Sequence, residues 1–300
     1  MAATLTPLPG YAKPGGTVER GRFAEHHRRM KSLVMLLSIA MTGTAAAAPG
    51  DPTFDSLSMG RLTPISTVSF EFGYEIWDEP DAVDINIFTL NFAGHFVSRR
   101  GYGGYFVLPL TYLDLDIPLV IDDSDMAVGN VEVGGLFTKF FGRTALVFHG
   151  GFALPTAQED GAAGYQFFGA FTRLSDAALH VTNSTWARLG FSPMGRSGNF
   201  LWRADIGLDL ALDEDNNNEY SPILYLNVGG GVDVGSAQLL VELVNVFSGE
   251  DDADDDGSTL SLGARFTSGS LRPGIGLLLP IDFDGVDFEA ALLASMAVRL

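Results

Sequence analysis

The chain has 300 residues, of which 46% are hydrophobic and 18% are charged, and it carries a formal net charge of -19 at pH 7. An acidic chain of this kind argues against nucleic acid as a partner, because a phosphate backbone requires a basic surface. The absence of cysteine excludes disulfides, thiolate metal sites and cysteine nucleophiles, and no run of about 18 uncharged apolar residues after the first fifty predicts a membrane-spanning helix.

The first part of the chain has the features of an export signal. Arg28, Arg29 and Lys31 precede an apolar stretch over 33–41, which leads into small residues over 42–48. This order predicts a secretory signal peptide over 30–47. We interpret 1–29 as an over-extended reading frame or a disordered N-terminus, with an unusually long charged region as the alternative. Residues 48–64 are then expected to be a periplasmic lead-in, and 65–300 the folded domain.

Alternation of apolar and polar residues recurs throughout 65–300. In the clearest run, 199–212, even positions are apolar while Arg203, Asp205 and Asp209 occupy odd positions. A tilted strand crosses a bilayer with about 9 to 11 residues, and these runs have about that length. The pattern predicts an all-β fold, a transmembrane antiparallel up-and-down β-barrel of 12 strands, with 14 strands as the second choice. The expected strands lie near 66–77, 83–97, 104–113, 129–140, 143–155, 183–194, 199–212, 220–234, 237–248, 258–267, 271–281 and 288–300.

The connections between these strands form two alternating populations. One population is long and holds most of the acidic residues, whereas the other is short, rich in glycine and free of Asp and Glu. Barrels with short periplasmic turns and longer outer loops show this alternation. The long connections are 78–82, 114–127, 156–182, 213–219, 249–257 and 282–287.

The stretch 161–183 is the least decided part of the pattern. Residues 165–174 fit a further strand, a short helix folded into the lumen, or a loop that caps the mouth. One extra strand would exchange the two ends of the barrel, so only an even number of strands agrees with the sorted connections.

The polar positions of the strands are expected to face the lumen, where a charge has to be hydrated or paired. In one interpretation, residues of opposite sign pair across the bore and brace the wall. In the other, the arginines form a basic ladder that sets the selectivity of a small pore. The same alternation assigns Glu289 to the lumen. Trp77 and Phe288 lie near strand ends, where an aromatic girdle at the outer rim is expected. The lumen-lining candidates are Glu132, Arg188, Arg203, Asp205, Asp209, Glu242 and Arg265.

One acidic connection has a spacing that is typical of calcium loops. Asp252, Asp254 and Asp256 alternate before Gly257, so that their carboxylates can converge on one ion. The twelfth position is Gly263, where a calcium loop carries a bidentate Glu. The three aspartates are therefore a candidate calcium site, with a solvated acidic loop as the alternative, and no other cofactor is expected.

The chain resembles Gram-negative outer-membrane barrels. Its last strand ends in alternating Met296, Val298 and Leu300, although these barrels usually end in Phe or Trp. Residues 142–156, GRTALVFHGGFALPT, resemble transporter-like outer-membrane proteins of the phenol-degradation-pathway type. This resemblance implies an outer-membrane location after signal-peptide cleavage, assembly by the barrel-assembly machinery, and passage of small, often hydrophobic molecules.

Two functions follow from these observations. The first is an outer-membrane channel or transporter for small solutes, hydrophobic ones among them. The second is a closed structural or surface-interaction barrel whose acidic loops contact lipopolysaccharide, cations or a partner. An enzyme is not expected, because His95, His149 and His180 lie in no familiar catalytic motif.

Overall fold

The computed structural model describes residues 52–77, 84–117, 121–157, 161–212, 220–249, 256–282 and 288–300. These residues belong to one compact unit. The predicted signal peptide over 30–47 and the segment 1–29 lie outside the described residues.

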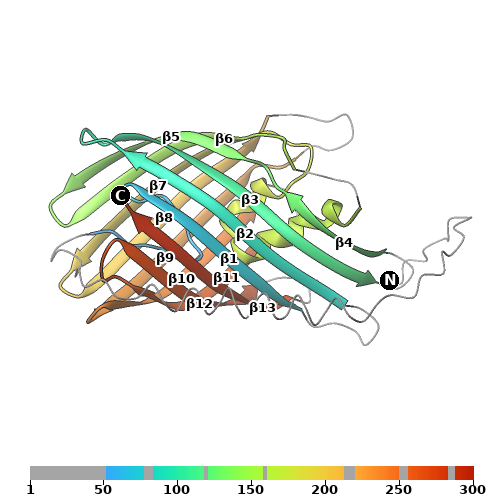
Figure 1. The fold of residues 1–300 in the computed structure, drawn as a ribbon. Helices are drawn as coiled ribbons and strands as arrows, with labels where there is room; N and C mark the ends of the chain where they lie inside the picture. Colours follow the sequence, from blue (N-terminus) through green and yellow to red (C-terminus); the bar gives the residue numbers. More distant parts are fainter. Residues whose placement is uncertain are drawn as a thin grey trace, which may run out of the picture. The chain divides into compact units, whose positions relative to one another are not determined.

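The described residues form thirteen strands, and twelve of them close into an antiparallel barrel (Figure 1). Each of the twelve strands other than β4 pairs with the next along the chain, β5 following β3, and β1 pairs with β13 from Thr67 opposite Arg299 to complete the ring. The predicted 12-stranded up-and-down barrel is thereby confirmed. The strands are β1 (Thr67–Trp77), β2 (Asp84–Val97), β3 (Tyr102–Ile117), β4 (Ile121–Val128), β5 (Glu132–Phe141), β6 (Thr144–Ala153), β7 (Trp186–Ser197), β8 (Phe200–Ala211), β9 (Ile223–Val234), β10 (Ala237–Ser248), β11 (Gly257–Phe266), β12 (Leu271–Asp282) and β13 (Phe288–Arg299).

Strand β4 is the additional strand, and it lies where the sequence predicted a loop. Residues 110–117 of β3 pair with β4, whereas residues 102–107 of β3 pair with β5. β4 and β5 therefore share one edge of β3, with Gly129, Asn130 and Val131 between them. Leu113 and Leu115, on the longer β3, are buried. They form one buried cluster with Ile87 of β2 and Ala127 of β4. The hairpin of β3 and β4 is therefore longer than its many aspartates suggest.

The short connections gather at one end of the barrel. Gly101, Gly142, Gly198, Gly235 and Gly269 all have positive φ, a backbone region that glycine enters without steric penalty. These turns lie at the end of the barrel where the C-terminus is drawn in Figure 1. The predicted sorting of connections thus holds for the short turns.

The outer face of the wall is apolar, as the alternation predicted. Phe70, Leu224, Leu226 and Val228 are exposed on the wall, as a lipid-facing surface requires. These exposed side chains form an apolar band on the outside of the barrel.

Three residues near one rim differ from the prediction. Trp77 and Phe288 pack inside the barrel, where the distance between their ring centroids is 5.5 Å, so the outer girdle predicted for them is wrong. Glu289, predicted to face the lumen, is exposed. For Phe288 and Glu289 the cause is a register shift in the pairing of β1 with β13, where Ile76 lies opposite Ala290 and Trp77 opposite Phe288, because one extra residue reverses the faces of a strand. Trp77 occupies an odd position of β1, as the buried Glu75 does, so the alternation itself places it inside.

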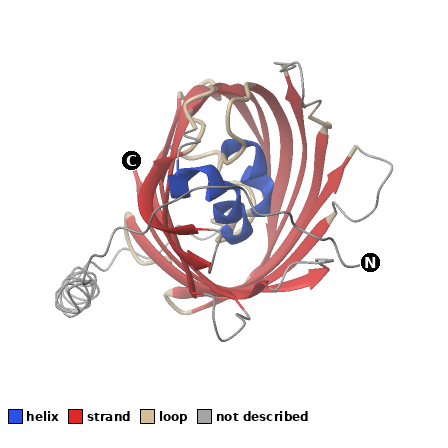
Figure 2. Cartoon of the chain, turned by 90° about the vertical axis from the view of Figure 1, so that its right-hand side faces the viewer, coloured by secondary structure: helices blue, strands red, loops and turns tan. Residues whose placement is uncertain are grey.

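Residues 161–180, here called the helical segment, fold into the lumen. They contain two 3-10 helices, η1 (Gly161–Thr172) and η2 (Leu174–Leu179), which lie inside the ring of strands in Figure 2. Of the three alternatives for 165–174, the structure shows the helix. Among the described residues, no helix is long and apolar enough to cross a membrane.

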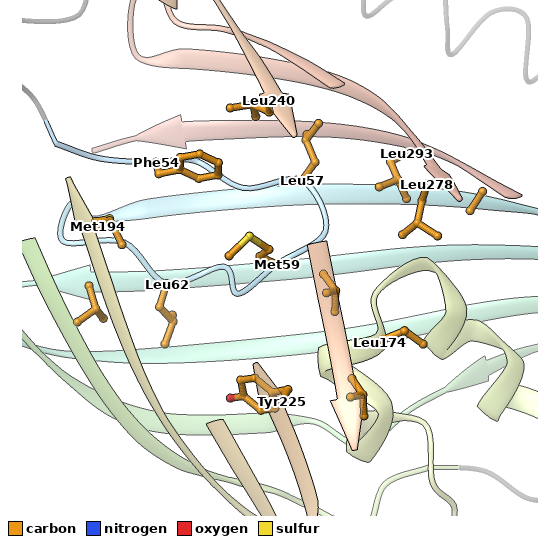
Figure 3. Packing of buried hydrophobic residues seen from close by; sticks show 14 of the residues in the cluster. Phe54, Leu57, Met59, Leu62, Leu174, Met194, Tyr225, Leu240, Leu278 and Leu293 are labelled. Carbon is orange, nitrogen blue, oxygen red and sulfur yellow. The ribbon is translucent and has the colours of Figure 1, made fainter. Parts of the chain in front are cut away.

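Residues 52–66, here called the N-terminal segment, also lie within the barrel. Phe54, Leu57, Met59 and Leu62 are buried in the largest hydrophobic cluster (Figure 3). This stretch belongs to the predicted periplasmic lead-in over 48–64, and that prediction did not include contacts with the lumen wall.

Candidate functional site in the barrel lumen

Glu242 on β10 holds the middle of the N-terminal segment. Its carboxylate accepts hydrogen bonds from the backbone N–H groups of Leu57 at 2.8 Å and Ser58 at 2.7 Å. The hydroxyl groups of Ser56 and Ser58 donate to the same carboxylate at 2.9 and 2.8 Å. Hydrogen bonds to a charged acceptor are stronger than neutral ones. The segment is therefore fastened through its backbone as well as its side chains.

Three arginines from β11, β12 and β13 surround the start of the same segment. Arg272 and Arg299 donate to one carboxylate oxygen of Asp55 at 2.8 and 2.9 Å, and Arg265 donates to the backbone carbonyls of Asp55 and Ser56, both at 2.9 Å. Burial raises the pKa of the Asp55 carboxyl, but the charges of the arginines outweigh it, so the pKa lies below its usual value.

A second wall pair contacts the turn of the N-terminal segment. Arg203 donates through Nε to Asp205 at 2.7 Å, and both side chains lie on β8. The backbone N–H of Gly60 donates to Asp205 at 2.9 Å, and Arg203 reaches the carbonyl of Phe54 at 3.3 Å. The N-terminal segment therefore supplies part of the hydrogen-bond partners of Arg203 and Asp205, and the wall supplies the rest.

The two inserted segments are joined to each other by an ionic cluster. Arg61 of the N-terminal segment pairs with Asp176 of the helical segment and donates to Glu71 of β1 at 2.7 Å. Arg173 donates to the carbonyls of Met59 and Leu57. Burial raises the pKa of the Asp176 carboxyl, and the nearby arginines lower it further than burial raises it. Asp176 thus remains an anion between cationic neighbours.

Arg188 on β7 connects the wall to the helical segment. Its guanidinium lies 2.5 Å from Glu132 on β5 and 3.0 Å from Asp209 on β8, and it donates to the carbonyl of Ser175 at 2.5 Å. One arginine therefore contacts two buried carboxylates and also binds the start of η2.

Aromatic side chains fill the other end of the helical segment. Trp77 meets Phe168 and Phe171 edge to face, with ring centroids 5.2 and 5.3 Å apart. Phe171 also packs against Phe288 at 5.2 Å. Such contacts add to the apolar area that the cluster buries, and they attach η1 to the seam between β1 and β13.

Two small cavities lie beside these contacts in the described part of the lumen. One of about 30 Å³ borders Asp55, Arg265 and Glu71, and another of about 40 Å³ borders Glu132 and Arg188. Cavities of this size hold a few water molecules at most.

The structure places all seven lumen-lining candidates inside the barrel, and none of these residues is more than 4% exposed. The interpretation of a basic ladder is not what the contacts show, because each arginine has its own set of partners. One cluster contains Glu132, Arg188 and Asp209, and a second contains Arg203 and Asp205. The remaining two candidates, Glu242 and Arg265, bind the N-terminal segment.

Sequence reasoning missed four charged partners, which come from the inserted segments: Asp55, Arg61, Arg173 and Asp176. The available signal was compositional. A solvated lead-in is expected to be polar, whereas several apolar residues occur over 54–62. These apolar residues are buried.

The candidate calcium site falls largely outside the structure. Asp252 and Asp254 lie outside the described residues, while Asp256 accepts a hydrogen bond from the backbone N–H of Ser248 at 3.0 Å. Within the described ranges, no three acidic, His or Cys side chains are grouped as metal ligands. The calcium site stays a prediction.

Comparison with known proteins supports the fold. No protein-family model matches the sequence, and no curated protein matches it. An outer-membrane channel from Pseudomonas putida F1 matches with a TM-score of 0.61 at 12% identity, over 83% of this chain and 100% of that one. The NanC porin gives 0.49 at 7% identity over 78% and 100%. The toluene transporter TodX of Pseudomonas putida gives 0.42 at 9% identity over 85% and 95%.

The closed wall, its apolar outer face and the first of these likenesses define the fold as that of an outer-membrane β-barrel. The 12-stranded wall also fits the resemblance to transporter-like outer-membrane proteins that residues 142–156 carry.

Proposed function

We propose that the protein is an outer-membrane channel for small solutes and that the described arrangement is its closed state. The observation that carries this proposal is the way the lumen is filled. Two segments that are not strands occupy it, and both are held by hydrogen bonds and ion pairs to the wall.

The size of the barrel supports this interpretation. About eight strands give a barrel whose interior is just filled by side chains of its own wall, and larger barrels leave room for a ligand or a channel. With twelve strands, the wall encloses more space than its side chains fill. The inserted segments occupy that space, and their displacement would leave a polar passage.

The second candidate, a closed structural or surface-interaction barrel, is favoured by the pairing of lumen charges. Arg188 contacts two carboxylates and Asp55 contacts two arginines, so each of these buried charges has a partner of opposite sign. This pairing stabilises a permanently closed barrel as well as a closed channel. The two candidates differ in whether the segments move.

The test is ion conductance of the purified full-length protein in planar bilayers. A channel is expected to show low basal conductance with discrete openings, and a higher open probability when Glu242→Gln weakens the hold on the N-terminal segment. Bilayers that stay silent for both proteins, together with unchanged solute uptake in a deletion strain, would overturn the channel in favour of the closed barrel. Heat-dependent migration on gels establishes that each protein is folded.

The remaining parts of the proposal concern the cellular context. The sequence supports export through the signal peptide over 30–47 and folding by the barrel-assembly machinery in the outer membrane of a Gram-negative bacterium. The acidic connections suit contacts with lipopolysaccharide through divalent cations. The proposal includes small solutes, hydrophobic ones among them, and no catalytic step.

A further inference from the structure

Three arginines on neighbouring strands bind the inserted N-terminal segment, two of them through its carboxylate and the third through its backbone carbonyls. Arg265, Arg272 and Arg299 lie on β11, β12 and β13, all at the end with the short turns. Among the described acidic residues of these three strands, Asp282 is at the opposite end of β12 and Glu289 is exposed. The carboxylate that Arg272 and Arg299 share is that of Asp55 on the inserted segment.

A hollow in the wall adjoins these arginines and takes an apolar side chain. Leu57 packs onto Gly263, Gly274 and Gly276, where side chains would collide with it: a Cβ at Gly274 would lie 2.8 Å from Leu57 and one at Gly276 3.1 Å away. The same Cβ at Gly274 would lie 3.3 Å from the guanidinium carbon of Arg265. The glycine-lined hollow and the arginines are therefore continuous. The position of Leu57 among its apolar neighbours is visible in Figure 3.

The N-terminal segment thus presents to this wall a carboxylate and, two residues later, a branched apolar group. Guanidinium groups are well suited to bind a carboxylate. An anion without an apolar part could contact the arginines but would leave the hollow unfilled. Together the two features have the chemistry of a site for a small carboxylic acid with a hydrophobic part.

We propose that Arg265, Arg272, Arg299 and the hollow at Gly263, Gly274 and Gly276 form a binding site for small amphipathic carboxylates, which Asp55 and Leu57 occupy in the closed barrel. The inference rests on the proposed function and names its solute class. The internal residues act as a tethered competitor, so a solute binds when the segment gives way. Vacating the site should then strengthen the binding of a free carboxylate.

The probe is 4-fluorobenzoate, and its binding to the purified full-length protein in micelles is followed by ¹⁹F NMR. Asp55→Asn removes the internal carboxylate and is expected to tighten binding at least tenfold relative to the unchanged protein. The double variant Asp55→Asn, Arg272→Gln is expected to lose this gain. Asp233→Asn, which removes a carboxylate paired with Arg196 elsewhere on the wall, is the matched control and should bind as the unchanged protein does.

Two further probes test the ligand class. Binding of 4-fluorobenzamide, which keeps the ring and lacks the charge, should not respond to Asp55→Asn. Fluoroacetate, which keeps the charge and lacks the ring, should gain less than fluorobenzoate does. Equal affinity for the acid and the amide, or displacement of fluorobenzoate by sulfate at the same concentration as by benzoate, would overturn the proposal.

A second variant covers the case in which Asp55→Asn does not fold. Leu57→Ala empties the hollow while Asp55 stays, and it should improve fluorobenzoate binding and leave fluoroacetate unchanged; no gain for either probe counts against the site. Because binding is measured in micelles, it is separate from conductance. A protein that binds fluorobenzoate and never conducts overturns the channel and keeps the site, whereas one that conducts without this binding does the reverse.

Discussion

Glu242 on β10 lies 2.7 Å from the backbone nitrogen of Ser58, although 184 residues separate the two in sequence. The carboxylate also accepts from the Ser58 hydroxyl at 2.8 Å. A wall residue thus binds the backbone of an inserted segment, and the backbone N–H groups are present whatever side chains the segment carries. This contact therefore depends chiefly on Glu242.

Replacing Glu242 by Gln should release the N-terminal segment. An amide cannot accept all the hydrogen bonds that the carboxylate accepts, and a buried donor left unsatisfied costs about 1–3 kcal/mol. We expect faster hydrogen exchange at residues 56–59 and a higher open probability in bilayers. Glu289→Gln makes the same chemical change on an exposed position of β13 and should alter neither. Equal exchange in the two variants would contradict the assigned role.

Replacing Arg188 by Met should destabilise the whole barrel. The change leaves Glu132 and Asp209 buried without the guanidinium that contacts both, and breaking a buried pair of this kind costs about 3–5 kcal/mol. Unfolding in urea, followed by tryptophan fluorescence in micelles, should occur at a clearly lower concentration. Arg143→Met, on an exposed turn, is the control, and a common midpoint for the two variants would show that the cluster contributes little.

Alternation predicted the twelve strands of the wall and most of their faces, because a residue period of two is a local property of the backbone. β10 was predicted over 237–248 and is found over Ala237–Ser248. β4 was missed because Asp122, Asp123 and Asp125 are exposed there and make the strand look like a loop. The exposed face of Glu289 was missed because a register shift leaves no trace in the alternation.

The same period identified the lumen residues but not their partners. Arg265 was assigned to the lumen from its strand, whereas its contacts with Asp55 and Ser56 lie about two hundred residues away in a segment without periodicity. Partners of this kind depend on tertiary packing. The apolar residues of 54–62 could have indicated burial, but not which wall residues receive them.

Asn130 fastens the helical segment at the junction of β4 and β5. Its side-chain amide donates to the carbonyls of Ala178 at 3.1 Å and Val181 at 2.7 Å, and its oxygen accepts from the backbone N–H of Ala157 at 3.0 Å. Asn130→Ala should therefore leave buried groups unsatisfied and cost about 1–3 kcal/mol locally. Hydrogen exchange at residues 174–181 should become faster. Asn245→Ala, which loses a bond to the carbonyl of Leu226 on the wall, should leave this exchange unchanged; if it does not, the effect is global.

His180 ends the helical segment in a buried position that disfavours its charged form. Burial lowers its pKa to about 4, although Asp176 and a hydrogen bond to the backbone of Gln166 act in the opposite direction. Arg61 and Arg188 add to the lowering, and the Thr111 hydroxyl lies 3.5 Å from Nδ1.

Acid should therefore release the helical segment. The imidazole has an ordinary pKa of 6.5 and a folded pKa of about 4, so the released form takes up a proton first. The free energy that holds the segment is complete above pH 6.5 and declines toward pH 4, by at most about 3 kcal/mol. Open probability in bilayers should rise across this range, and His180→Gln, which carries no titrating group, should flatten the profile. An identical rise in the variant would assign the acid response to other groups.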